Sequence, residues 1–170
     1  GIPVIYYGSE IGFMRGKTEH EGNRNYFGQV NIDQATSHSI YQNLQHIAKI
    51  RQKSVALQKG IQYNLILDKN RAAFYRVYQH KGTNQTALVL LNKNDKAESF
   101  TFSELTQAGQ WRSAITGKII SIKNVNNRLK LKVPAHGVEV LLFEGELNNP
   151  DLIQHLNAQM AAKLHRTNGE

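Results

Sequence analysis

The chain opens on apolar residues that do not alternate with polar ones. Residues 2–7 read IPVIYY, a β-branched and aromatic run that Gly1 and Gly8 bound. Such a run is typical of a strand buried on both faces, as in a parallel sheet or a barrel. A strand of this kind needs neighbours on both edges. Because the run starts at the first residue, without an initiator Met, we expect the chain to be a C-terminal fragment of a larger protein.

The pattern then changes to a long polar segment and a helix. Residues 9–36 are rich in glycine, asparagine and charge, and segments of this length inside compact domains are usually functional or disordered. From Ser37 to Leu57, apolar residues recur at helical spacing, with Ser37 or Ser39 as the N-cap and Gly60 as the stop signal.

Between residues 61 and 144 the sequence predicts short strands separated by turn signals. The expected strands are Gln62–Leu67, Ala72–Tyr78, Thr86–Leu91, Glu98–Phe102, Gln110–Ile115, Ile119–Ile122, Arg128–Val133 and Val138–Phe143. Short strands at close spacing predict an antiparallel β-sandwich. We expect residues 87–92 to form a central strand and Trp111 to lie in the core.

The last segment, from Asn149 to about Arg166, predicts a terminal helix. Asn149 is placed to cap it, Pro150 suits its first turn, and Asp151 lies where negative charge is favourable. Its apolar stripe comprises Leu152, Ile153, Leu156, Met160 and Leu164. We expect this stripe to pack on the preceding fold; the alternative is that it binds a partner.

The first segment also resembles a known family. GIPVIYYGSEIG is similar to the eighth-strand segment of the α-amylase superfamily, which has the form G-[IV]-P-x-[IL]-Y-Y-G-x-E. The matching residues are Gly1, Ile2, Pro3, Ile5, Tyr6, Tyr7, Gly8 and Glu10. Residues 22–24, reading GNR, resemble the end of the family's D-P-x-N-R loop. Residues 50–60 resemble the end of its last barrel helix.

The resemblance implies a fold that is α/β first and all-β afterwards. Residues 1–60 would be the last strand, loop and helix of a (β/α)8 TIM barrel. Residues 61–147 would be the antiparallel C-terminal β-sandwich, and residues 148–170 the terminal helix. The implied parent is a retaining hydrolase or transglycosylase of the α-amylase, cyclomaltodextrinase or cyclodextrin glucanotransferase type, which acts on α-1,4 bonds of starch or maltooligosaccharides.

Catalysis in this family uses an Asp, a Glu and a further Asp that follow strands four, five and seven. All three precede the eighth strand, so the resemblance implies no catalytic residue in this chain, and Glu10, Glu19 and Glu21 are not candidates. We expect no cofactor here. Calcium would be bound by loops of the N-terminal part that this chain lacks, and that missing barrel is the expected protein partner.

The chain can still contribute one wall of a sugar site. By resemblance, Asn23 and Arg24 belong to the loop that reaches donor-side sugars, and guanidinium donors suit hydroxyl oxygens. The alternative role for Arg24 is a salt bridge that braces the loop. His20 stands where the family usually has Asp, which puts donor-side contacts in question. Tyr7 is a candidate for stacking on a sugar or, alternatively, a core residue of the strand.

Composition narrows the remaining function classes. The chain has 170 residues, no cysteine and a formal net charge of +8. The missing cysteines exclude disulfides and thiolate chemistry and leave the compartment open between the cytoplasm and a secreted or periplasmic location. A positive net charge is typical of proteins that bind nucleic acids. The basic residues are scattered along the sequence, however, so we expect no nucleic-acid partner. No apolar run reaches the roughly 20 residues of a membrane helix, so we expect no membrane partner.

One function of a different class stays open from the sequence. The strands of residues 61–147 could form a non-catalytic carbohydrate-binding or structural module. Retention of residues 61–170 alone on insoluble starch would favour this alternative.

Overall fold

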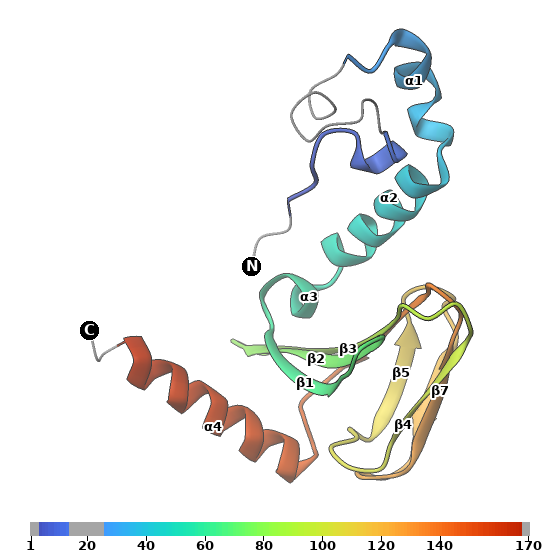
Figure 1. Ribbon diagram of the computed structural model, residues 1–170. Helices are drawn as coiled ribbons and strands as arrows, with labels where there is room; N and C mark the ends of the chain where they lie inside the picture. The colour runs from blue at the N-terminus through green and yellow to red at the C-terminus, as the bar shows by residue number, and fades with distance from the viewer. Residues whose placement is uncertain (1–3, 14–25, 168–170) are drawn as a thin grey trace. The chain divides into compact units, whose positions relative to one another are not determined.

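The computed structural model describes residues 4–13 and 26–167 (Figure 1). It divides into two compact units, residues 1–52 and 53–170. The first contains the helical elements η1 (Ser9–Ile11), α1 (Gln29–Gln34), η2 (Ala35–Ser37) and α2 (Ser39–Gln52). The second contains α3 (Val55–Lys59), β1 (Ile61–Leu67), β2 (Arg71–His80), β3 (Thr83–Asn92), β4 (Glu98–Phe102), β5 (Gly109–Ser113), β6 (Ile119–Ile122), β7 (Leu129–Val133), β8 (Val138–Glu144) and α4 (Pro150–Thr167).

The expected N-terminal strand is wrong for the residues that the structure describes. Residues 4–6 have no regular secondary structure, and Tyr7 and Gly8 form a turn that leads into η1. A strand persists through hydrogen bonds to a neighbouring strand, and in the described part of the chain the paired strands are β1–β8 of the second unit. The apolar pattern alone does not hold residues 4–7 extended.

The expected loop at residues 9–36 is wrong in part, because η1, α1 and part of η2 lie within it. The expected helix at residues 37–57 is confirmed but is divided in two. The Ser54 hydroxyl accepts the backbone N–H of Leu57 and caps a new helix, α3. The amino end of α2 uses neither expected serine as a cap, since His38 Nδ1 accepts the N–H of Ile40 at 3.3 Å.

Gly60 ends α3, as expected, for a steric reason. A Cβ there would lie 2.5 Å from the carbonyl oxygen of Ala56 and 2.9 Å from the nitrogen of Val77. The backbone of α3 and the backbone of β2 therefore meet at a position where only glycine fits.

All eight expected strands are confirmed, with small shifts at their ends. They form two antiparallel sheets, one with the order β1-β2-β3-β8-β5-β6 and the other the two-stranded ribbon β4-β7. β3 lies third in the larger sheet, and its residues 85–90 are all buried. The expectation of a central strand there is confirmed, because β3 has β2 and β8 as neighbours and is covered on both faces.

The turn between β1 and β2 is held by hydrogen bonds between Asp68 and Arg71. The Asp68 carboxylate accepts the backbone N–H of Arg71 at 2.8 Å and two side-chain hydrogen bonds from the same arginine. These guanidinium hydrogen bonds lower the pKa of Asp68.

One hydrophobic core lies between the two sheets and α4. Trp111 is 1% exposed, and its ring lies 6.1 Å from that of Tyr75 and 5.4 Å from that of Phe143. The core position expected for Trp111 is confirmed. The ribbon contributes Phe100, Phe102, Leu129 and Val133, and α4 contributes Leu152 and Leu156. Burial raises the pKa of the Tyr75 phenol.

The terminal helix packs on this sheet, as expected. Asn149 Oδ1 accepts the N–H of Leu152 at 3.0 Å, which confirms the predicted cap. Leu152 and Leu156 are 0% and 6% exposed. Further along α4, Gln159 Nε2 donates to the Gln62 carbonyl of the edge strand β1, and Figure 1 shows α4 continuing past β1. None of the helices in the described ranges is long and apolar enough to cross a lipid bilayer.

Two buried amides fasten the ends of the second unit. Gln85 Oε1 accepts from Ser54 Oγ at 2.6 Å and from the N–H of Ala56 at 3.0 Å, so α3 is tied to β3. Gln107 Oε1 accepts the N–H groups of Asn148 and Asn149, so the start of α4 is tied to the segment before β5. Buried polar groups that are fully hydrogen-bonded fix a unique arrangement of the elements around them.

Candidate functional site

The first unit contains an aromatic cluster around Gly8. The rings of Tyr7 and Phe27 stack with centroids 4.3 Å apart, and Phe13 meets Phe27 edge-on at 4.7 Å. Gly8 has a φ of 83°, and a Cβ there would lie 2.9 Å from atoms of both phenylalanines. The glycine allows the chain to turn directly under the rings, so the cluster depends on it.

A hollow of about 470 Å³ lies beside this cluster, between the N-terminal segment and α2. Ile5, Tyr6, Tyr7 and Glu10 line it from one side. The residues from α2 are Tyr41, Leu44, Gln45 and Ala48, which recur at the spacing of one helix face.

The residue types in the hollow suit binding better than hydrolysis. Phenol, amide and carboxylate groups hydrogen-bond hydroxyls, and aromatic rings offer flat apolar faces. Glycoside hydrolysis needs two carboxyl groups on either side of the scissile bond. Among the described residues that line the hollow, Glu10 is the one carboxylate. No group of three or more His, Asp or Glu side chains gathers for a metal in the described residues.

Of the four candidate sugar-site residues, one lies in the described part of the chain and three lie outside it. Tyr7 lies in the hollow, half-exposed and stacked on Phe27. His20, Asn23 and Arg24 lie outside the described residues. Their role stays a prediction.

Sequence reasoning missed the contribution of α2 to the hollow. Leu44 and Ala48 belong to the apolar stripe that predicts the helix, but a stripe does not tell which other segment it faces. The signal that could have added Tyr41 is its spacing of three from Leu44, which places both residues on one helix face.

No protein-family model and no curated protein sequence matches the chain. Solved structures do match. An α-amylase from Anoxybacillus has a TM-score of 0.62 and 20% identity, over 87% of this chain and 30% of its own. An α-amylase from Geobacillus thermoleovorans has a TM-score of 0.64 and 21% identity, over 86% of this chain and 30% of its own.

A cyclodextrin glucanotransferase also shares the fold. The γ-cyclodextrin glucanotransferase from alkalophilic Bacillus clarkii has a TM-score of 0.60 and 24% identity, over 86% of this chain and 21% of its own. The chain therefore spans about 30% of the length of the α-amylases it matches. It has the fold of the corresponding region of these enzymes, which supports the resemblance to an α-amylase-family fragment seen in the sequence.

Proposed function

We propose that the chain is the C-terminal part of an α-amylase-family enzyme that acts on α-1,4 bonds of starch or maltooligosaccharides. The observation that carries the proposal is the fold match over 86% of the chain, at a TM-score of 0.64, to an α-amylase. The sequence G-I-P-V-I-Y-Y-G-S-E at the start of the chain supports it independently. In this proposal residues 1–60 complete a (β/α)8 barrel.

The surface of the first unit supports a missing partner of this kind. Val4 is 87% exposed and Ile5 is 56% exposed. Of the described residues in this unit, Gly8 is the one that is buried. Apolar side chains gain about 25 cal/mol for each Å² removed from water, so a further protein layer over this segment would stabilise it. The remainder of the barrel would supply that layer.

In this proposal the catalytic groups and some of the sugar contacts lie in different parts of the protein. A retaining glycosidase uses one carboxyl group as acid and base and another as nucleophile, and we assign both to the preceding part, with any calcium ion. This chain would supply contacts to the sugar through Asn23, Arg24, His20 and Tyr7. Two of the matching structures are described as complexes, with acarbose for the Geobacillus enzyme and with maltose for AmyP, and ligands of this class suit hydroxyl-binding side chains.

The test is the activity of the full-length gene product on amylose and maltoheptaose. We expect release of reducing ends, with the α-anomer as first product by proton NMR. Arg24→Ala should lower kcat/KM by about tenfold or more, since one charge-assisted hydrogen bond is worth about 1.5–3 kcal/mol. Lys17→Ala, seven residues earlier in the sequence, is the matched control and should stay near the parent value.

A full-length product without activity on either substrate would refute the enzyme proposal. If residues 53–170 alone were then retained on insoluble starch, the carbohydrate-binding alternative would replace it. That unit has a core of its own, so the two measurements can be made separately.

A further inference from the structure

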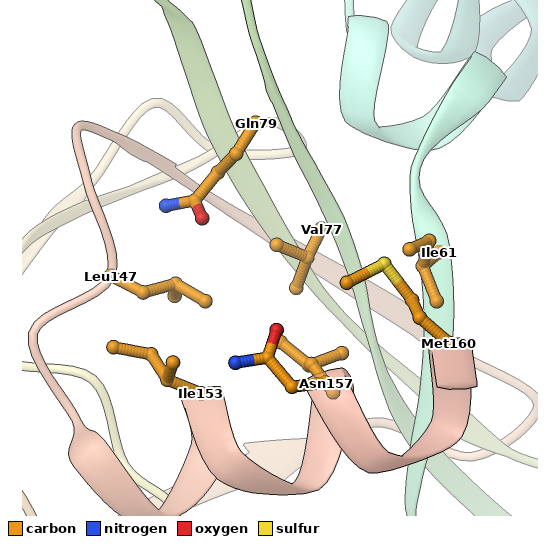
Figure 2. A pocket seen from close by; sticks show the side chains of 8 residues that line it. Ile61, Val77, Gln79, Leu147, Ile153, Asn157 and Met160 are labelled. Carbon is orange, nitrogen blue, oxygen red and sulfur yellow. The ribbon is translucent and has the colours of Figure 1, made fainter. Parts of the chain in front are cut away.

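A second pocket lies in the second unit, between α4 and the end of the sheet that β1 and β2 form. Its volume is about 130 Å³. Figure 2 shows the side chains that surround it, with aliphatic groups on its walls and two amides. The amides belong to Gln79 and Asn157, and both residues are exposed.

The sheet side of the pocket continues a row of core residues. Ala73, Tyr75 and Val77 are buried on the inner face of β2, and Gln79 follows at the same alternation, so it lies on that face as well. Ile61 of β1 is the pairing partner of Val77. The row of core residues thus ends in an amide at the mouth of the pocket.

The helix side is formed where α4 passes from buried to exposed positions. Leu156 is 6% exposed, whereas Ile153 and Met160 are 36% and 40% exposed. Residues 153, 156, 157 and 160 all line the pocket, which is the spacing of one helix face. Figure 2 shows the Asn157 and Gln79 amides directed into the space between helix and sheet.

We infer that this pocket binds a small neutral molecule that combines one ring-sized apolar group with a hydroxyl or carboxamide. None of the described residues that line it is charged, so the pocket offers no counter-ion to an ionised ligand. Both amides can donate and accept, as a hydroxyl or carboxamide requires. The pocket volume of about 130 Å³ is close to that of an aliphatic cavity of about 150 Å³ in another protein, which holds one benzene molecule. The ring would therefore fill the pocket, and the polar group would lie at its mouth beside the two exposed amides.

Such a ligand would contact α4 and the sheet at the same time. It would therefore favour the docked position of α4 and raise the unfolding temperature of the unit as its concentration rises. The inference does not depend on the proposed enzymatic function, since the pocket lies wholly within residues 61–160.

The experiment is an NMR titration of the full chain with three probes of equal ring size. Benzyl alcohol has the ring and a hydroxyl, toluene has the ring alone, and benzylamine carries a charge. We expect benzyl alcohol to give saturable shifts at the Met160 methyl and the Asn157 amide. Toluene should bind about threefold to tenfold more weakly, which is the net contribution of one hydrogen bond, and benzylamine more than tenfold more weakly.

Two sets of variants make the result specific. Met160→Trp fills the pocket and should abolish the saturable shift of the Asn157 amide, whereas Ala161→Trp, on the next helical position and outside the lining, should leave that shift unchanged. The double variant Gln79→Leu, Asn157→Leu should bring the affinities for benzyl alcohol and toluene within twofold. Shifts without saturation, shifts centred outside the pocket, or unchanged binding by Met160→Trp would each overturn the inference.

Discussion

Exchange of Gln107 for glutamate tests the role of the buried amide that ties α4 to the rest of the second unit. The Gln107 side chain is 0% exposed. Its Nε2 donates to the carbonyls of Ala108 at 3.1 Å and Glu146 at 3.3 Å, while its Oε1 accepts from Asn148 and Asn149. Gln107→Glu keeps the shape and the acceptor but replaces the donating NH₂ group with an oxygen.

The expected cost depends on the ionisation of the new carboxyl. As a carboxylate it no longer donates to the Glu146 carbonyl, at about 1–3 kcal/mol, and it places an unpaired charge at a fully buried position. The Ala108 carbonyl keeps a donor, because Asn148 Nδ2 also donates to it at 3.2 Å. We expect a loss of about 4 kcal/mol at pH 7. As a neutral acid it regains one donor, so the loss at low pH should be about 1–2 kcal/mol. The pKa of the new group is thus raised by folding, and stability falls as the pH rises from about 4.

The assay is urea unfolding at pH 4 and pH 7, followed by tryptophan fluorescence. Trp111 is the single tryptophan, and its Nε1–H donates to the Gln107 carbonyl at 3.0 Å, so the probe lies beside the perturbed group. Gln110→Glu makes the same exchange at an exposed position of β5 and should change stability by less than about 0.5 kcal/mol. An equal loss at both pH values, or none at pH 7, would refute the reasoning.

Three further changes probe the same unit. Gln85→Ala removes the acceptor of Ser54 and Ala56 and should lower the free energy of unfolding by about 2–3 kcal/mol in urea titrations; a loss below about 0.5 kcal/mol would show that α3 is not held by this amide. Gly60→Ala places a Cβ 2.5 Å from a backbone oxygen and should lower the melting temperature by roughly 8 °C or more; an unchanged melting temperature would contradict that contact. Folding raises the pKa of Tyr75, so its contribution is complete below the ordinary tyrosine pKa of about 10 and is lost above it; Tyr75→Phe should flatten the stability profile between about pH 9 and 11, and parallel profiles would argue against this assignment.

The strands were predictable because their signals are local. Apolar residues, alternating in β1 and continuous in β3, and the polar turns at residues 68–70 and 81–84 define β1, β2 and β3 without reference to the rest of the chain. The pairing of β3 with β8 and of β4 with β7 was not predictable in the same way. These strands are far apart in sequence, and their order is chosen by the side chains that share the core.

The expected N-terminal strand shows that a local pattern is not always sufficient to predict a strand. Its apolar run is the strongest strand pattern in the chain, yet a strand buried on both faces is stable only with its neighbours.

The two buried amides, of Gln85 and Gln107, were not predicted for a different reason. Nothing in the sequence distinguishes a buried glutamine such as Gln85 or Gln107 from an exposed one. Only the fold shows that each is surrounded by hydrogen-bond donors and acceptors.

For the candidate site, the sequence supplied Tyr7 and the resemblance supplied Asn23 and Arg24. Leu44 and Ala48 were recognisable as one face of a helix, but the segment that this face meets depends on the tertiary structure. The sequence thus supplied candidate residues, and the fold was needed to say which of the described ones line the same hollow.

The place of β8 within the larger sheet governs how this domain can be completed while it is being synthesised. β3 ends at Asn92, whereas its inner neighbour β8 begins at Val138. Until that later segment leaves the ribosome, the nascent chain can form a three-stranded sheet of β1 to β3 whose inner edge is open and whose Leu88 and Leu90 lack their cover. Open edges invite pairing with other chains. In the interval between the translation of residues 92 and 144, the inner edge of β3 is therefore open to such pairing.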